Sequence, residues 1–425
     1  MQKIYKDTFF SFVGLSFPIV IAIFTIPTFI EELTREMFGI LTIMWAVVGY
    51  FGLFDLGLGR ALVYEASKNS KNSKKLEEIL FAGILITSFA GIFGGLFILI
   101  ISNYIQDILN FKNLDSVKVK EAFLIISFSV IFTTTTSGIR GFFEGLKKFR
   151  SSSINRVLVG SSLFLFPYLF LIFGIEEVTY FAFAIFMARF LGFIHIFILA
   201  FKYLPRKKVI KFDNIKTLFE YGSWITLSGI IGPIMIYSDR FILSNLLGLS
   251  QIPNYSVVQE IITRGLVLPA SLANAILPRI SESKEKMVIK SHYLFSIKRI
   301  FLMMLPISIF IILFSNQILT LWVNEEFASE MNYIFKIMSV ALFFASLSQA
   351  PLIGLYGISK PKEVALIHSI ELFFYIFMIF FLVNLYGIIG AAYAWTIRVI
   401  IDFFLLHFTF SLKLKNYEYK IRRSN

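Results

Sequence analysis

Ionisable side chains lie inside long apolar stretches of this 425-residue chain. A charge at bilayer depth costs a few kcal/mol or more, so it normally faces a partner or an aqueous cavity. The charges nearest the middle of their stretches are Arg189, Asp239, Arg240, Glu260, Arg264, Arg398 and Asp402, and those nearer the ends are Asp55, Arg60, Lys336 and Glu371. These residues are the first candidates for binding chemistry.

Their spacing separates paired charges from unpaired ones. Glu260 to Arg264 and Arg398 to Asp402 are both i,i+4, so each pair can meet on one helix face. Such pairs either serve a site or only lower the cost of insertion, and the spacing leaves both interpretations open. Asp239 and Arg240 are adjacent and point to different faces, so they need partners on other helices or a wet cavity. Arg189 has no carboxylate three or four residues away.

Arginines in a polar cavity suit an anion, because a guanidinium binds phosphate with two parallel hydrogen bonds. We therefore predict a phosphorylated or carboxylated ligand rather than a cation. The predicted binding cations are Arg189, Arg240, Arg264 and Arg398. The acidic residues that could carry a coupling proton or sodium ion are Asp55, Asp239, Glu260 and Glu371.

Other chemistries find no support in the sequence. The chain has no cysteine, so it has no disulfide and no zinc–thiolate site. Gly57 and Gly59 lack the third glycine of a dinucleotide fingerprint and lie near the end of an apolar stretch. The histidines form no metal-ligand spacing, although His368 and Glu371 are i,i+3 and could form a proton site. The sequence predicts no catalytic site, no cofactor and no metal.

The charges are carried by twelve stretches that could each cross a bilayer. A span needs about 20 mostly apolar residues to cross a core of about 30 Å. The predicted spans are Thr8–Ile30, Phe38–Val63, Leu80–Ile101, Ala122–Ile139, Val157–Ile175, Tyr180–Ala200, Phe219–Leu247, Tyr255–Ile276, Ile300–Trp322, Met331–Tyr356, Val364–Leu385 and Gly387–Leu412. Charged residues make up only 16 % of the chain, against about 25 % in soluble domains. The sequence therefore predicts an all-α polytopic membrane protein with 12 transmembrane helices.

Lysine and arginine are unevenly divided among the linkers. The N-terminus, every second linker and the C-terminal tail hold 30 of the 40, the opposite linkers hold 4, and 6 lie inside spans. Cytoplasmic loops retain positive charge, so both termini are predicted to be cytoplasmic. This topology explains the net charge of +13 better than nucleic-acid binding does. The first apolar run ends at Glu31 and Glu32 rather than at a small-residue cleavage site, so we interpret it as a retained span.

The chain also divides into two similar halves. We predict an N-terminal six-helix bundle over residues 1–203, a cytoplasmic linker over 204–216 and a C-terminal six-helix bundle over 217–425. Both halves would enter the membrane from the cytoplasm and form a pseudo-symmetric pair. Repeats of this kind are typical of transporters that bind their cargo between the halves.

Several sequence blocks resemble one known family, the polysaccharide (O-antigen or repeat-unit) flippases of the MATE-like multidrug/oligosaccharidyl-lipid/polysaccharide exporter superfamily. The most specific block is "GSWITLSGIIGPIMIYSDRF" at Gly222–Phe241. Weaker blocks, in the order of the family, are Phe54–Leu62, Ile139–Phe149, Leu277–Ser283, His368–Tyr375 and Tyr386–Asp402. The resemblance covers nearly the whole chain.

The resemblance implies two six-helix bundles around a central cavity, in the inner membrane of a bacterium. It implies a cargo of undecaprenyl-diphosphate-linked oligosaccharide, flipped from the cytoplasmic to the outer leaflet by alternating access for O-antigen, capsule or exopolysaccharide biosynthesis. A proton or sodium gradient would drive the cycle, as the superfamily suggests. A polymerase or ligase of the same pathway is a further option as a partner.

Three other functions compete. A cation-coupled multidrug exporter of the same fold would use acidic residues to bind cationic drugs, but the mid-span charge is largely arginine. A membrane polymerase or glycosyltransferase would be expected to carry a large outer loop with catalytic residues, and the outer linkers here are short. A passive structural partner would have no need for charges inside the membrane.

Overall fold

The computed structural model describes residues 2–53, 57–105, 114–204, 212–247 and 252–417. Every regular element in these residues is a helix. The chain divides into two compact units, Met1–Thr226 (unit 1) and Leu227–Asn425 (unit 2). This agrees with the all-α class predicted from the apolar stretches.

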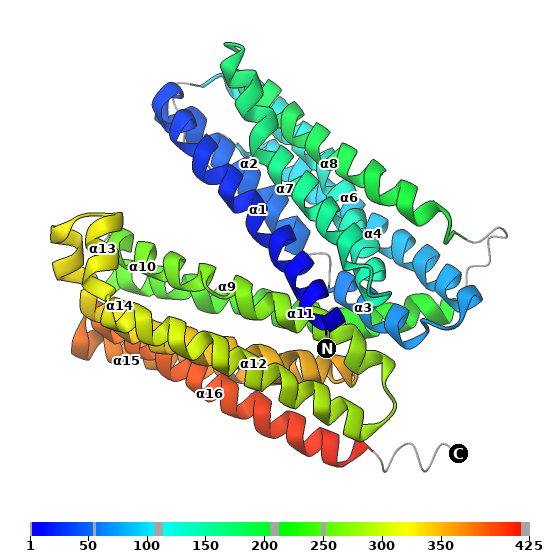
Figure 1. Ribbon diagram of the computed structural model, residues 1–425. Helices are drawn as coiled ribbons and strands as arrows, with labels where there is room; N and C mark the ends of the chain where they lie inside the picture. Colours follow the sequence, from blue (N-terminus) through cyan, green and yellow to red (C-terminus); the bar gives the residue numbers. More distant parts are fainter. Residues whose placement is uncertain (1, 54–56, 106–113, 205–211, 248–251, 418–425) are drawn as a thin grey trace. The chain divides into compact units, whose positions relative to one another are not determined.

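Unit 1 contains the helices of the N-terminal half (Figure 1). They are α1 (Gln2–Glu32), α2 (Arg35–Leu53), α3 (Leu58–Lys68), α4 (Ser73–Ser102), α6 (Ser116–Gly145), α7 (Phe149–Ile172) and α8 (Val178–Phe201), followed by the start of α9 (Phe212–Leu247). Asn72 and Asp115 cap α4 and α6, because each side chain accepts a hydrogen bond from a backbone N–H of the first turn.

Unit 2 contains the rest of α9 and the helices that follow it. They are α10 (Ile252–Arg264), α11 (Val267–Glu282), α12 (Lys286–Leu313), α13 (Ser315–Trp322), α14 (Glu325–Gly357), α15 (Pro361–Tyr386) and α16 (Ile388–Lys415). Asn324 caps α14, and Pro361 begins α15 at a position where its missing N–H costs nothing.

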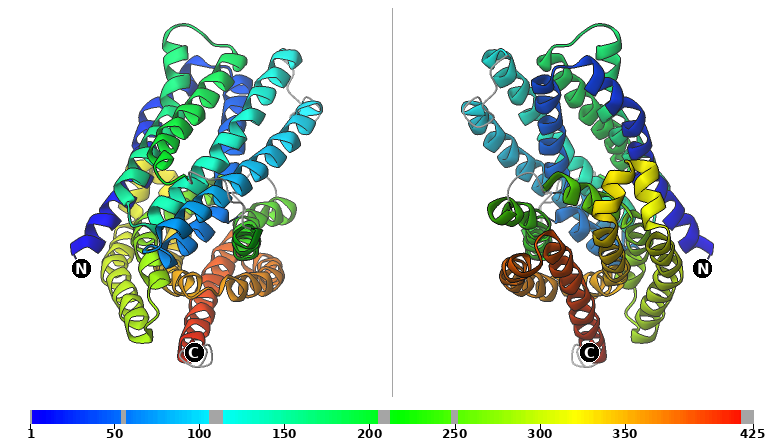
Figure 2. Two further views of the ribbon diagram at one scale, coloured as in Figure 1. Left: turned by 90° about the vertical axis from the view of Figure 1, so that its right-hand side faces the viewer. Right: turned by 90° about the vertical axis from the view of Figure 1, so that its left-hand side faces the viewer.

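The two units pack their helices in the same pattern (Figure 1 and Figure 2). In unit 1, α6 contacts α3, α4 and α8, and α7 contacts α8. In unit 2, α14 contacts α11, α12 and α16, and α15 contacts α16. In the most apolar windows of both α6 and α14, 67 % of residues are buried. Because α6 and α14 carry the fourth and tenth predicted spans, this agreement supports the internal repeat.

The helices agree with most of the predicted spans and correct two of them. Ten helices of the described residues are long and apolar enough to cross a membrane, and α2 adds a shorter apolar segment, Glu36–Gly49. The protein is therefore a multi-pass membrane protein, and the count of twelve spans stays a prediction. The second predicted span is divided into two helices, α2 and α3, whereas the eighth lies within one candidate membrane span, Tyr255–Glu282, with a short break between α10 and α11. The ninth predicted span is wrong at its end, because α12 stops at Leu313 and α13 is a separate short helix.

Local backbone conformation accounts for the division of the second predicted span. Gly57, just before α3, has φ +63°, in the left-handed region that favours glycine. A Cβ at this position would lie 2.5 Å from the carbonyl oxygen of Gly222 in α9. The second predicted span therefore turns at a residue that no larger side chain could replace without displacing a neighbouring backbone.

Close packing of α6 depends on a row of glycines on one of its faces. Gly138, Gly141 and Gly145 follow the i, i+3, i+7 spacing of a single helix face. A Cβ on Gly141 would lie 2.1 Å from the carbonyl oxygen of Gly59, and one on Gly145 would lie 2.7 Å from that of Val63. Small residues let α3 and α6 approach until their backbones nearly touch.

Replacing Gly141 with Ala should destabilise the protein by about 1–3 kcal/mol, because the new methyl group meets backbone that cannot rotate away. The measurement is the thermal midpoint of the purified protein in detergent. Gly39→Ala in α2 is the matched control, since a Cβ there meets nothing within 4 Å. An unchanged midpoint for Gly141→Ala would contradict the close contact between α3 and α6.

Candidate functional site

A cluster of ionisable side chains lies inside unit 2, where α9, α15 and α16 meet. His368 and Glu371 come from α15, and Asp402 comes from α16. One ligand atom from each of these three residues lies within 4.8 Å of the other two. His368 Nε2 lies 3.4 Å from Asp402 Oδ1, and His368 Nδ1 lies 2.7 Å from the hydroxyl of Ser228 on α9. The imidazole therefore links α9 to α16.

Arg398 lies beside this group but does not pair with Asp402. Its Nη1 lies 3.6 Å from Met235 Sδ, and its guanidinium carbon lies 5.6 Å from the ring centroid of Tyr375. The structure describes both Arg398 and Asp402, and it shows no ion pair between them. The i,i+4 spacing allows an Arg398–Asp402 ion pair, but in the folded protein Asp402 contacts His368 on the neighbouring helix instead.

Glu371 is the most isolated member of the cluster. Its side chain is 5 % exposed, and neither carboxyl oxygen has a hydrogen-bond partner in the described structure. Counting Glu371 and Asp402 as ionised, Arg398 as cationic and His368 as neutral, the cluster carries one net negative charge. A buried site with this balance is stabilised by one proton or one monovalent cation. The imidazole and carboxylate donors are also ligands that a divalent metal accepts.

Asp239 forms a polar contact between α9 and α10 and also lies close enough to Tyr375 to interact with it electrostatically. Its carboxylate is fully buried and accepts hydrogen bonds from the Tyr255 hydroxyl at 2.9 Å and from the Gln259 side-chain amide at 2.7 Å. Because Asp239 and Arg240 are adjacent, the sequence predicts that Asp239 needs partners on another helix. Tyr255 and Gln259 are such partners. These hydrogen bonds offset much of the cost of burying the carboxylate.

Unit 1 carries one arginine at the corresponding place in its last membrane helix. Arg189 is the twelfth residue of α8, and Arg398 is the eleventh residue of α16. Arg189 makes no ion pair or hydrogen bond with any side chain that the structure describes, and its Nε is buried without a partner. Further along α8, His195 Nδ1 lies 3.3 Å from Asn155 Nδ2 on α7. The two units thus share the arginine but not the carboxylates.

The remaining predicted residues fall into two groups. Arg264 and Glu260 form the i,i+4 ion pair at 3.2 Å, with side chains 67 % and 46 % exposed. An exposed pair of this kind contributes little to stability. Asp55 lies outside the described residues, and the side chain of Arg240 does too, although its backbone belongs to α9.

Sequence reasoning missed most of the neutral residues that contact the cluster or Asp239. Ser228, Tyr255 and Gln259 gave no signal, because a hydroxyl or amide in a helix is usually unremarkable. Tyr375 could have been found, since it lies four residues after Glu371 and therefore on the same helix face. Its hydroxyl is buried without a hydrogen-bond partner in the described structure.

An ion pair at the end of α6 also escaped prediction. Glu144 accepts hydrogen bonds from Arg156 at 2.7 Å and from the Ser152 hydroxyl, and both partners lie on α7. Glu144 belongs to the block Ile139–Phe149, which also contains Gly141 and Gly145. This block therefore fixes α6 against both α3 and α7.

Solved structures with the same fold are transporters. A multidrug resistance MATE family transporter of the MOP superfamily, in an outward-facing conformation, superimposes with a TM-score of 0.85 at 14 % identity, covering 98 % of this chain and 96 % of its own. A MOP superfamily transporter from Pyrococcus furiosus gives a TM-score of 0.82 at 14 % identity over 98 % of this chain and 96 % of its own. The fold is that of the MATE-type transporters.

The sequence comparisons define the family more narrowly. The family model described as "Polysaccharide biosynthesis protein" matches residues 4–284. A putative O-antigen transporter of Shigella flexneri is 30 % identical over 98 % of this chain and 100 % of its own length. A putative O-antigen export protein of Yersinia pseudotuberculosis is 23 % identical over 65 % of this chain and 64 % of its own.

The chain belongs to the polysaccharide biosynthesis protein family. The resemblance found in the sequence blocks is confirmed. The named sequence relatives are a putative O-antigen transporter and a putative O-antigen export protein, which agrees with the expectation of a transport protein rather than an enzyme.

Two substitutions should separate a functional carboxylate from a structural one. Glu371→Met should raise the thermal midpoint in detergent, because it removes a buried carboxyl group that accepts no hydrogen bond. Asp239→Leu should lower stability by about 1–3 kcal/mol, because it removes the acceptor shared by Tyr255 and Gln259. A lower midpoint for Glu371→Met would show that Glu371 stabilises the fold instead.

Proposed function

We propose that this protein is a flippase for undecaprenyl-diphosphate-linked oligosaccharide repeat units. It moves them from the cytoplasmic to the outer leaflet of the bacterial inner membrane by alternating access. The product serves O-antigen, capsule or exopolysaccharide biosynthesis. A flippase is needed because neither a sugar chain nor a diphosphate can cross hydrocarbon unaided.

The observation that carries this proposal is the match to the putative O-antigen transporter of Shigella flexneri, at 30 % identity over its full length. The family model over residues 4–284 supports the same class of cargo. The MATE-type neighbours, at about 14 % identity, share the fold and leave the cargo open. A multidrug exporter is therefore the alternative that the experiment must separate.

The charges inside the helices suggest that unit 1 binds the anionic cargo and unit 2 binds the coupling ion. Arg189 in unit 1 has no carboxylate partner in the described structure, so it is suited to an anionic group such as a diphosphate. The cluster of Glu371, Asp402, His368 and Arg398 in unit 2 has one excess negative charge and is suited to a coupling proton or sodium ion. We assign anion binding first to Arg189, whereas Arg398, Arg240 and Arg264 are weaker candidates, since Arg398 already faces the carboxyl groups of its own cluster.

The acidic residues are ranked in the same way. Glu371 leads as the coupling residue because it is buried without a hydrogen-bond partner. Asp239 is satisfied by neighbouring donors, and Glu260 is paired with Arg264. Both remain weaker coupling candidates, together with Asp55.

The decisive experiment is deletion of the gene in its host. Lipid-linked repeat units should accumulate in the cytoplasmic leaflet, and surface glycan should disappear. Wild type should restore surface glycan, whereas Arg189→Ala should restore it at least about tenfold less well, since a lost charge-assisted contact is worth about 1.5–3 kcal/mol.

The matched control is Lys118→Ala, which removes an exposed cation that pairs with Glu177 at 3.2 Å. This variant should export glycan as well as wild type does. Intact glycan in the deletion strain, with raised sensitivity to cationic drugs, would favour the multidrug exporter. Full activity of correctly inserted Arg189→Ala would contradict its role in anion binding.

Coupling can be tested in vesicles that carry an imposed proton or sodium gradient. We expect the gradient to accelerate repeat-unit transport by wild type, and Glu371→Gln to lose that acceleration because it cannot exchange a proton or hold a cation with its full charge. Glu176→Gln, an exposed carboxylate between α7 and α8, is the control and should respond as wild type does. An undiminished response of Glu371→Gln would exclude this residue from coupling.

A further inference from the structure

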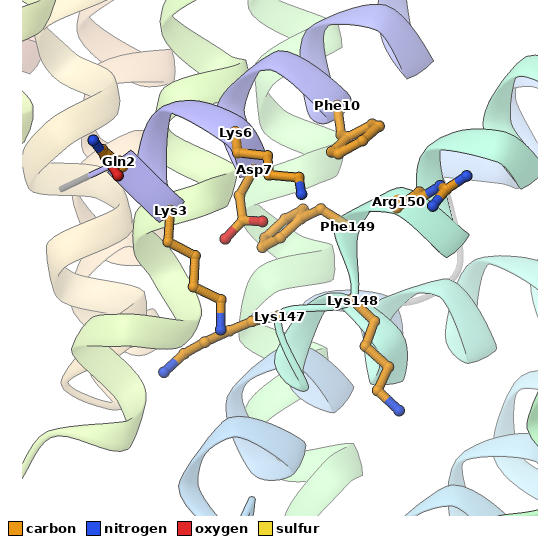
Figure 3. A pocket seen from close by; sticks show the side chains of 9 residues that line it. All are labelled: Gln2, Lys3, Lys6, Asp7, Phe10, Lys147, Lys148, Phe149 and Arg150. Atoms are coloured by element: carbon orange, nitrogen blue, oxygen red, sulfur yellow. The ribbon is translucent and has the colours of Figure 1, made fainter.

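A cavity of about 420 Å³ lies at one end of unit 1, between the start of α1 and the connection from α6 to α7 (Figure 3). This volume lies in the range of small-molecule sites. Its ionisable lining residues are Lys3, Lys6, Asp7, Lys147, Lys148 and Arg150. Five cations thus surround one carboxylate, and segments about 140 residues apart in the chain supply them.

The lining residues differ in what they can offer to a ligand. Lys148 donates to the Tyr203 hydroxyl and lies 4.7 Å from the centroid of its ring, so its ammonium group is already engaged. Asp7 is 6 % exposed, whereas Lys3, Lys6 and Arg150 are exposed. Figure 3 shows Lys3 extending from α1 toward Lys147. The accessible part of the cavity is therefore strongly positive.

The N-termini of α1 and α7 meet at this cavity. Both carry basic side chains in the first turn, where acidic ones are favoured. Neither α1 nor α7 has an acidic residue in its first turn, and α7 has no side-chain cap. The first amides of a helix lack intrahelical acceptors, and its positive dipole end favours anions. Lys3 and Arg150 are therefore placed where they oppose the dipole, and a bound anion would relieve this repulsion.

The end of α6 explains only part of the basic cluster. Lys147 N–H donates to the Glu144 carbonyl at 2.9 Å, and Lys148 N–H donates to the Phe143 carbonyl at 2.8 Å, which closes α6 in a Schellman motif. Cations are favoured at such a C-terminus. This accounts for Lys147 and Lys148, but not for the cations at the two helix starts.

Exposed aromatic side chains lie at the same end of α1, on a different face of the helix from the residues that line the cavity. Tyr5 is 45 % exposed and Phe9 is 61 % exposed, one and two turns into the helix. A ligand that fits both features has an anionic head and an apolar tail. The topology predicted from the loops places this end of α1 and the α6–α7 connection at the cytoplasmic leaflet.

We propose that this cavity binds the phosphate-bearing head group of a lipid in the cytoplasmic leaflet, namely the diphosphate of the lipid-linked cargo before it is flipped. The inference rests on the proposed function for the identity of the cargo. A diphosphate places two adjacent phosphates among the cations, whereas a bulk phospholipid offers only one. The site would therefore select cargo at its point of entry.

The test measures lipid binding to the full-length protein in nanodiscs of phosphatidylcholine. The probes are undecaprenyl diphosphate and phosphatidylglycerol. Lys147→Gln/Arg150→Gln should weaken undecaprenyl diphosphate binding roughly 10-fold or more, because two charge-assisted contacts are lost. Lys71→Gln/Lys74→Gln, at the exposed α3–α4 connection on the same predicted side, removes equal charge outside the cavity and should bind as wild type does.

Each outcome decides one point. Equal binding of undecaprenyl diphosphate by both double variants and wild type would overturn the site. Loss of phosphatidylglycerol binding alone in Lys147→Gln/Arg150→Gln would overturn the cargo assignment and identify a site for bulk phospholipid. The deletion strain separates this inference from the proposed function: if wild type restores glycan while the cavity variant binds cargo normally, only the inference fails. If wild type restores no glycan, the proposed function fails.

Discussion

Charge buried among apolar helices must be compensated locally, and this requirement shapes both units. A buried carboxylate with no hydrogen bond and a buried guanidinium with no counter-ion each cost more than a typical hydrogen bond returns. Glu144 and Asp239 meet the requirement with partners on neighbouring helices. Glu371 and Arg189 do not meet it within the described structure. The best explanation for such uncompensated charges is that ligands of opposite charge bind to them during transport.

The repeated packing makes the difference between the units informative. Within each unit, the helices pack against one another in the same pattern. Each unit also carries one arginine near the middle of its last membrane helix. A common scaffold therefore holds Arg189 without an ion pair in the described structure and Arg398 close to the carboxyl group of Glu371. Because the packing is shared, the contrast comes from side chains alone. This contrast underlies the proposal that unit 1 binds an anion and unit 2 binds a coupling cation.

The sequence predicted the helical class and most span positions because apolar length is a strong signal in a membrane protein. It failed where the backbone turns inside an apolar run. Gly57 is one such point, since hydropathy does not register a left-handed residue. The family could also be predicted from the sequence, because several sequence blocks occur along the chain in the same order as in the family.

The site was less predictable than the fold. Spacing along one helix identified Glu260 and Arg264 as a pair, and the structure forms it. The same rule suggested Arg398 and Asp402, yet Asp402 contacts His368 from α15. Contacts within a helix follow from the spacing of residues in the sequence. Contacts between helices depend on how each helix is rotated about its axis and how deep it lies in the membrane, and neither can be predicted from a single sequence. The basic cavity was hidden for the same reason, since its cations come from two distant segments.

The two cationic features of unit 1 differ in a way that suits successive steps. The cavity at the start of α1 combines accessible lysines with exposed aromatic side chains, so it can exchange a lipid head group with the membrane surface. Arg189 lies in the middle of α8, away from any described counter-ion, where a phosphate would be bound in a poorly solvated setting. Capture by several exposed cations is fast and reversible, because Lys3, Lys6 and Arg150 lie at the protein surface. Transfer to a single desolvated arginine is selective, because only an anion can neutralise it.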